Sequence, residues 1–258
     1  MNLTRASVGM ISRHSPFIIL FAGLACSLTL GCGSVDPADK SKQDSDGSAG
    51  ASSAPPEGPL LPWAVGNNWT YRVTKAGAVS EKTTTIGDLE TVGGEGPHAA
   101  DMAYHVTTAK GSDLNDHTES WQIPSDSDPE RIVRYREQSF DASTGDLDTD
   151  EYWDPEKLHI DGSAERTVKG QSWLEVYDET KLQVGLSPAT HEVRERWTVL
   201  DDDETLEVPA GTFEHTIHFQ KVGASSTKEY WYLRGVGKLK ETGTQTEELT
   251  DYSLEATP

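Results

Sequence analysis

Three aspartates of this 258-residue chain are spaced as they would be in a calcium loop. Asp146, Asp148 and Asp150 occupy positions 1, 3 and 5 of such a loop. Its sixth and twelfth positions fall on Glu151 and Lys157, where the loop needs glycine and glutamate. We therefore predict a solvated acidic loop here, without a calcium ion.

Two histidines could bind zinc if their side chains pointed the same way. His215 and His218 lie three residues apart in a predicted strand, so regular strand geometry places them on opposite faces. We predict surface positions or cross-strand partners for both residues, and no metal site.

Signatures of catalysis are missing from the sequence. It contains neither a G-x-S-x-G elbow nor an H-E-x-x-H pattern, and no G-x-G stretch precedes a predicted helix that could bind a phosphate. The only cysteines, Cys26 and Cys32, precede the expected folded domain. We predict a protein that is not an enzyme and has no cofactor.

Lipidation of a cysteine is the chemistry that the sequence supports. Arg5 and Arg13 precede an apolar stretch over residues 16–30, which ends just before Cys32. This stretch is shorter than the roughly 20 residues that cross a bilayer. The pattern predicts a lipoprotein signal peptide over residues 1–31 and an acyl anchor on Cys32.

The segment around this cysteine resembles the lipobox of bacterial lipoproteins. Thr29 stands where a lipobox usually has leucine, so lipidation at Cys26 and an ordinary cleaved signal peptide remain alternatives. In the sorting scheme that the resemblance implies, Gly33 in place of aspartate favours the outer membrane. We expect a lipid-anchored protein of the cell outer membrane that faces the periplasm.

A polar linker separates the expected anchor from the folded domain. Residues 32–59 are rich in Ser, Asp and Ala, and a single valine is their only sizeable aliphatic residue. Because such a segment cannot bury enough apolar surface, we predict that it is disordered. The chain has 22 basic and 43 acidic residues, a net charge of −21; without Arg5 and Arg13 the mature chain carries −23. This balance opposes binding to nucleic acid or to an anionic membrane surface through a basic patch.

Residues 60–258 form the expected folded domain, and their hydrophobicity alternates with a period of two. The alternation predicts strands over residues 69–74 and 102–107, and again around 193–199 and 217–219. Such alternation is typical of antiparallel sheets with one solvated face. We predict one mainly β domain with a curved antiparallel sheet, half-barrel or clamshell-like, and as the alternative a two-sheet β-sandwich.

Turn residues and prolines predict how these strands are connected. Residues 201–204 and 223–226 are predicted hairpin loops of a meander. Short helices are predicted over 154–158 and 187–192, where a proline stands near the start of each segment. The strand over 230–233 has aromatic or aliphatic residues at every position, which predicts that both of its faces are covered.

A proline and three glycines are predicted to bend the sheet. Pro209 has no N–H for a strand ladder, and Gly211 can adopt positive φ. Gly235 and Gly237 could kink the sheet or allow the backbone to approach closely. We assign all four residues to architecture and not to ligand binding.

Three segments together resemble a family of uncharacterised bacterial envelope lipoproteins. They begin at Gly66 (GNNWTY), Val208 (VPAGTF) and Tyr230 (YWYLRGVGKLKE), and match the patterns G-N-x-W-x-Y, V-P-A-G-T-F and Y-W-x-x-x-G-V-G-x-x-K-E. The resemblance implies a mostly antiparallel, curved sheet. It implies no activity and no catalytic residues.

Two non-enzymatic roles follow from these observations. The seven tryptophans, at positions 63, 69, 121, 153, 173, 197 and 231, favour a binding module whose sheet encloses a lipid or another hydrophobic ligand, although they fit a filled core equally well. The alternative is a structural or protein-interaction component that meets another envelope protein through its acidic face or a sheet edge. We favour the binding module.

Overall fold

The computed structural model describes residues 54, 56–111 and 115–255. Residues 52–258 form one compact unit of the chain. The predicted signal peptide, both cysteines and nearly all of the predicted linker lie outside the described residues.

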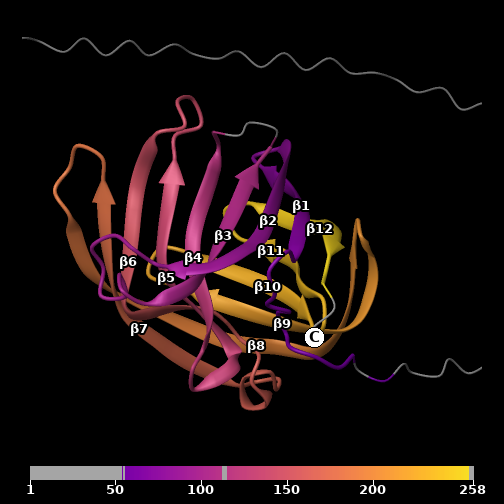
Figure 1. The fold of residues 1–258 in the computed structure, drawn as a ribbon. Helices are drawn as coiled ribbons and strands as arrows, with labels where there is room; N and C mark the ends of the chain where they lie inside the picture. Colours follow the sequence, from indigo (N-terminus) through magenta and orange to yellow (C-terminus); the bar gives the residue numbers. More distant parts are fainter. Residues whose placement is uncertain (1–53, 55, 112–114, 256–258) are drawn as a thin grey trace, which may run out of the picture. The chain divides into compact units, whose positions relative to one another are not determined.

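Twelve strands and one short 3-10 turn make up the regular structure of the described residues (Figure 1). The strands are β1 (Asn68–Lys75), β2 (Ala78–Thr91), β3 (Met102–Lys110), β4 (His117–Ser125), β5 (Asp128–Phe140), β6 (Leu147–Asp161), β7 (Ser172–Gln183), β8 (Ala189–Val208), β9 (Gly211–Val222), β10 (Thr227–Leu233), β11 (Gly237–Thr242) and β12 (Thr246–Ser253), and the turn is η1 (Ala164–Arg166).

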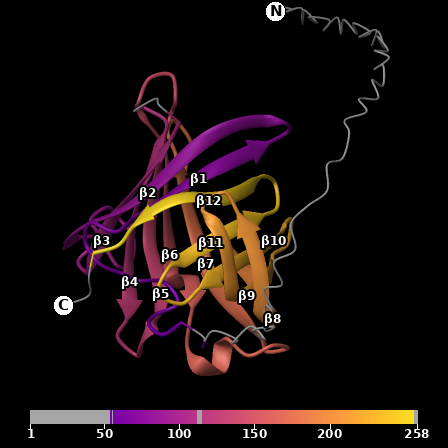
Figure 2. The same ribbon diagram turned by 90° about the vertical axis from the view of Figure 1, so that its right-hand side faces the viewer.

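The strands form a closed antiparallel barrel in which each strand pairs with its neighbours in the sequence. β1 also pairs with β12, with Trp69 opposite Tyr252 and Val73 opposite Glu247, and Figure 2 shows β12 between β1 and β11. The predicted mainly β, antiparallel meander is confirmed. The half-barrel and the sandwich were wrong, because the pairing of the first and last strands leaves the sheet without a free edge.

Alternation along the strands separates the barrel interior from its outer face. Val199 and Trp197 are buried on β8, while Arg194 and Arg196 between the inward positions are exposed, as the sequence predicted. On β10 all four residues from Tyr230 to Leu233 are buried, so its prediction of two covered faces is also confirmed.

The two predicted helices were wrong. β6 runs through residues 154–158 and contains a cis peptide bond between Asp154 and Pro155. β8 begins at Ala189, where the hydroxyls of Thr180 and Thr190 lie 2.8 Å apart across the β7–β8 ladder. Cross-strand pairing with β7 thus overrides the local helix signal of a proline in the first turn.

Of the two predicted hairpin loops, one is confirmed and one was wrong. Residues 223–226 connect β9 and β10 as expected. Residues 201–204 lie inside β8, where the register against β9 shifts, and His215 opposite them has a φ of 61°. A bulge therefore accommodates the acidic run, and the chain reverses later, after Val208.

The residues that the sequence assigned to bends lie at one end of the barrel. Pro209 and Ala210 connect β8 to β9, where Val208 pairs with Gly211. Gly235 (φ 72°) and Gly237 (φ 104°) flank the β10–β11 turn. A side chain at Gly237 would collide with Leu61 and Trp69, whose indole donates a hydrogen bond to the carbonyl of Val236 at 2.6 Å.

The segment over residues 57–67, which we call the strap, closes this end of the barrel. Leu60 is fully buried, and its amide donates to the carboxylate of Glu130 at 3.3 Å. Arg234 donates to the carbonyls of Gly58 and Gly162 at 3.2 and 2.7 Å and also pairs with Glu130. The strap is thereby connected to β5 and to the residues that directly follow β6 and β10.

A second, smaller cluster lies on the outer face beneath the β2–β3 connection, which crosses in front of β4, β5 and β6 in Figure 1. Arg136 stacks on Trp121 at 4.6 Å and donates two hydrogen bonds to Asp150, at 2.8 and 2.7 Å. It also donates to the carbonyl of Val92, the first residue of the connection, at 2.9 Å. A single guanidinium thus joins three strands and the connection that covers them.

Replacement of Leu60 by alanine should destabilise the barrel, because the strap would lose its fully buried anchor. We expect Leu60→Ala to lower the free energy of unfolding by about 2 to 5 kcal/mol, measured by urea denaturation of the full chain. Leu186→Ala is the matched control: its side chain is 67% exposed in the β7–β8 connection, and its change should stay within about 0.5 kcal/mol. Equal losses in the two variants would show that the strap is not part of the folded core.

Candidate ligand-binding cavity

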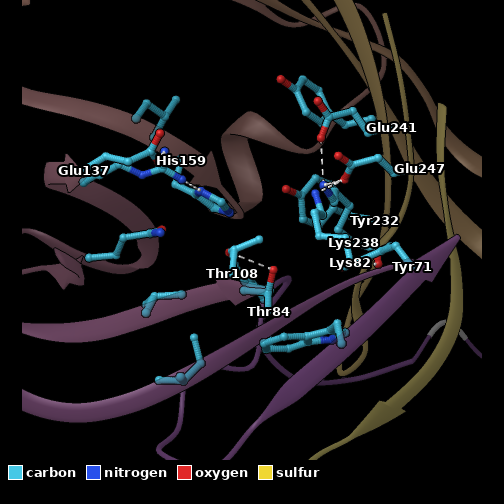
Figure 3. Close-up of a pocket in the computed structure, with 18 of the residues that line it drawn as sticks. Tyr71, Lys82, Thr84, Thr108, Glu137, His159, Tyr232, Lys238, Glu241 and Glu247 are labelled. Atoms are coloured by element: carbon cyan, nitrogen blue, oxygen red, sulfur yellow. Dashed lines mark hydrogen bonds and ion pairs between the residues drawn. The ribbon is translucent and has the colours of Figure 1, made fainter. Parts of the chain in front are cut away.

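The barrel encloses a cavity of about 350 Å³ (Figure 3). Its apolar lining residues are Leu61 and Trp63 of the strap, together with Trp69, Ile86, Val106 and Leu158. Toward the opposite end, where the β9–β10 and β11–β12 connections lie, the lining becomes charged. Six of the chain's 22 basic residues line this cavity, against three of its 43 acidic residues.

Aromatic side chains fill the rest of the barrel and narrow this space. Trp197 stacks between Trp173 and Tyr230, with ring centroids 6.2 and 5.5 Å away, and meets Phe219 edge-on at 6.4 Å. Trp153 is completely buried and donates to Glu179 at 3.0 Å. The aromatic core leaves a small cavity inside a wide barrel.

Five charged side chains form one network on the cavity wall, which we call the lysine cluster: Lys82, Lys228, Lys238, Glu241 and Glu247. The ammonium of Lys238 lies 2.7 Å from Glu241 and 2.8 Å from Glu247. Lys82 also pairs with Glu247, and Lys228 with Glu241 at 2.7 Å. The cluster therefore joins β2, β10, β11 and β12 inside the barrel.

A β-bulge brings two members of this cluster to the same face. Lys238 and Glu241 are three residues apart, so regular strand geometry would direct them to opposite faces. The register between β10 and β11 shifts between Trp231 and Tyr232, which leaves Leu239 as the extra residue. Lys238 then faces the cavity, and so does Glu241.

Burial and charge act against each other in the lysine cluster. Burial opposes the charge of Lys238, but Glu241 and Glu247 outweigh it and hold the pKa of Lys238 well above its usual value. Burial alone would raise the pKa of Glu247, yet Lys238 and Lys82 lower it to about 2. For Lys82, burial and the charge of Lys238 prevail over Glu247 and lower the pKa to about 8.

The opposite wall carries a second polar group, on β5 and β6. Arg134 pairs with Glu137 and donates to Nδ1 of His159 at 3.3 Å. Burial, with the charge of Arg134, lowers the pKa of His159 well below its usual value, so this imidazole is neutral. Figure 3 shows Glu137 and His159 across the cavity from the lysine cluster, with Thr84 and Thr108 between the two walls.

Three polar atoms of the lining have no hydrogen-bond partner among the described residues. They are Trp63 Nε1, Gln122 Oε1 and Arg134 Nε. Gln122 is only 3% exposed. An unpaired buried polar atom costs about 1 to 3 kcal/mol, so each of these three atoms is available to form a hydrogen bond with a molecule in the cavity.

The tryptophans that the sequence singled out divide between cavity, core and outer face. Trp63 and Trp69 line the cavity. Trp153, Trp173 and Trp197 belong to the aromatic filling described above, while Trp121 and Trp231 stack on His105 and His218. The cavity and the filled core, which the sequence left as alternatives, are thus both present.

Asp146, Asp148, Asp150 and the histidine pair do not belong to this cavity. The predicted solvated loop was wrong for Asp148 and Asp150, because both lie in β6, where Asp150 is buried. Asp150 is bound by Arg136, and His215 and His218 have carboxylate partners on β8, Asp203 at 2.6 Å and Glu204 at 3.1 Å. The cross-strand role predicted for the histidines is confirmed. Within residues 54, 56–111 and 115–255, no three His, Cys, Asp or Glu side chains are grouped so that they could hold a metal ion.

No sequence pattern identified the residues of the lysine cluster as a group. They come from four strands, and only their positions on the inward face of each strand unite them. Lys82, for example, is followed at alternate positions by Thr84 and Ile86, which also line the cavity. A charged residue at an inward position of an otherwise half-buried strand is the one local sign of such a site.

A pH series can test the environment of Lys82. The pKa of this lysine is lowered in the fold from its usual 10.5 to about 8, so between these values the unfolded chain binds more protons at this residue. The wild type should therefore gain stability relative to Lys82→Met as the pH rises from 8 to 10.5, by up to about 3 kcal/mol. Urea unfolding of both full chains at several pH values measures the difference. A constant difference would mean that Lys82 is solvated.

Comparisons with known proteins show no family. No family model matches the sequence, and no curated protein matches it. Two crystal structures resemble the barrel. One is a protein of Bacteroides fragilis with a YmcC-like fold, provisionally described as exported; it has 12% sequence identity and a TM-score of 0.46, and the match covers 75% of this chain and 98% of that one. The other is a protein of Parabacteroides distasonis, provisionally described as a lipoprotein; it has 13% identity and a TM-score of 0.41, and the match covers 76% of this chain and 99% of that one. With TM-scores below 0.5, these similarities give no information about what this chain binds. Within the described part of the chain, no helix could cross a membrane.

Proposed function

We propose that this protein is a non-catalytic, lipid-anchored binding protein of the bacterial envelope, whose barrel holds one small amphipathic molecule. The observation that supports it is the cavity itself, which is apolar near the strap, charged toward the other end, and lined by polar atoms without partners. A site with an apolar wall and a few convergent polar groups is typical of small-molecule binding.

The lining refines the expectation of a hydrophobic ligand. A purely apolar molecule would leave the charged wall and the partnerless atoms of Gln122 and Arg134 without hydrogen bonds. The volume of about 350 Å³ lies near the lower end of the range for small-molecule sites, roughly 300 to 1,000 Å³. We therefore propose a compact ligand or a single-chain amphiphile and not a complete two-chain lipid.

The proposed location rests on the N-terminal sequence. The arginines, the short apolar stretch and Cys32, with Cys26 as the alternative, support a lipid anchor, and Gly33 supports the outer membrane with the barrel facing the periplasm. Two of the three segments that resemble envelope lipoproteins meet at the strapped end, where Trp69 bonds to Val236. In the third segment, the amide of Ala210 donates at 2.9 Å to Leu249, which is paired with Tyr71 of the first. They therefore support a shared architecture.

A structural or protein-interaction role is the second candidate. Val184 and Leu186, in the connection between β7 and β8, are 68% and 67% exposed. Exposed aliphatic side chains on a hairpin tip suit a contact with another envelope protein. The acidic outer face of the barrel could contribute to the same contact.

Native mass spectrometry with lipid extraction tests the binding role. The full chain is purified gently from a bacterial envelope, together with Thr108→Trp, which places an indole in the cavity. We expect a stoichiometric small molecule with the wild type and its loss from Thr108→Trp.

Thr107→Trp is the matched control, because residue 107 precedes Thr108 on β3 and its side chain points to the outer face. This variant should retain the molecule. A wild type that has the mass of the protein alone, and that stays so when envelope lipid extracts are added, would contradict the binding role and favour the second candidate.

A further inference from the structure

The lysine cluster contains more positive than negative charge. Its three ammonium groups, Lys82, Lys228 and Lys238, share two carboxylates, Glu241 and Glu247. The side chains of Lys82 and Lys238 are each 15% exposed and that of Glu247 is 3% exposed. The side chain of Glu241 is 11% exposed and that of Lys228 is 35% exposed. With every member in its ordinary ionisation state, this largely buried group has a net charge of +1.

The other charges near the cavity do not remove this excess. Each of the remaining cavity cations has its own carboxylate: Arg134 pairs with Glu137, Lys221 with Glu195 at 2.8 Å, and Lys157 with Glu179 at 3.8 Å.

Two tyrosines beside the lysine cluster are also unable to balance its charge. Burial raises the pKa of Tyr71 and that of Tyr232 far above neutrality, so both phenols stay uncharged. The ring of Tyr71 lies 5.3 and 4.9 Å from the ammonium groups of Lys82 and Lys238 and faces these cations as a neutral neighbour.

A buried charge without a counter-charge is costly, and a bound anion removes that cost. We propose that the molecule bound in the cavity carries an oxyanion, a carboxylate or a phosphate-type group, which Lys82, Lys228 and Lys238 bind while its apolar part lies on the wall near the strap. This inference rests on the proposed function and specifies the chemical class of the ligand. The net charge of −21 on the chain means that selectivity for an anion must come from this cluster.

The position of the lysine cluster is consistent with an amphiphile whose apolar end enters the cavity first and whose charged head stays near the partly exposed Lys228. Lys228 lies at the start of β10, with its side chain 35% exposed, and therefore connects the cavity with solvent. The apolar lining includes Leu61 and Trp63 of the strap, and Trp69, whose indole bonds to Val236 at the strapped end. An anionic head at the lysines and an apolar body below them would fill both parts.

The titration of Lys82 provides an additional readout. The charged groups that face it are Glu247 from β12 and Lys238 and Glu241 from β11, while Lys110, opposite it on β3, pairs with Asp116 at 3.4 Å. An anion beside Lys82 stabilises its ammonium form, so binding should take up protons around pH 8. Affinity for the anion should accordingly fall as the pH rises above 8.

Three probes with the same apolar chain and different heads test the proposal: dodecanoate, dodecanol and dodecyltrimethylammonium. Each is titrated below its aggregation concentration against the full chain, after delipidation, and binding is measured by calorimetry and native mass spectrometry. We expect dodecanoate to bind roughly 10- to 100-fold more tightly than dodecanol, because it adds charge-assisted hydrogen bonds, and the cation to bind most weakly. The affinities of dodecanoate and of an alkyl phosphate with the same chain length are then compared to distinguish the two kinds of oxyanion.

Variants change the charge of the cluster in both directions. Lys82→Met and Lys228→Met each reduce the net charge of the cluster to zero and should abolish the preference for dodecanoate over dodecanol. Glu247→Gln raises it to +2 and should increase that preference. Lys181→Met is the matched control, because Lys181 lies on β7, is not part of the cavity lining and pairs with Glu151 at 2.7 Å.

The outcomes separate this inference from the proposed function. Equal affinity for dodecanoate and dodecanol, or a preference that survives in both lysine variants, would overturn the anion site and leave a cavity for neutral molecules. If none of the probes bound, and Thr108→Trp changed nothing, the binding function itself would fail. Because Lys228 lies at the partly exposed end of the cavity, its variant keeps the test decisive even if Lys82→Met does not fold.

Discussion

The whole barrel depends on one seam, between β11 and β12. Only two residue pairs, Lys240 with Glu248 and Glu241 with Glu247, connect these strands in the ladder, whereas β8 and β9 are joined along most of their length. Ion pairs reinforce the seam on both faces, Lys240 with Glu248 outside and Lys238 with Glu247 inside. Closure of the sheet, and hence the enclosed cavity, therefore relies on ion pairs between side chains at the place where the strands share the fewest backbone pairs.

The same lysines are therefore required for two tasks. Lys238 connects β11 to β12 through Glu247, and its charge also belongs to the excess that favours an anion. Lys82 contributes less to closure, because it lies on β2 and shares Glu247 with Lys238. Lys238 therefore serves mainly to hold β11 and β12 together, whereas Lys82 and Lys228 can be substituted with less effect on closure of the barrel.

Alternation of hydrophobicity predicted most of the strands. The site could not be predicted in the same way, because β-bulges change which side chains face inward. Alternation around Trp197 and Phe219 identified the inward faces correctly, because each strand obeys a period of two between its irregularities. The acidic run over residues 201–204 looked like a loop, since no sequence rule identifies a bulge that continues the strand. The extra residue at Leu239 likewise brings Lys238 and Glu241 together, and β1–β12 closure has no local signature at all.

Closure through β1 and β12 also has a consequence for the order in which the chain can fold. Thr70 receives a hydrogen bond from Thr250, 180 residues later, and Arg234 holds the strap that precedes β1. All the other pairings join strands that are consecutive in the sequence, so most of the meander can form while β1 still has one unpaired edge. The first strand to be synthesised is thus the last to be completed, and until β12 arrives the chain needs protection from pairing with another copy of itself.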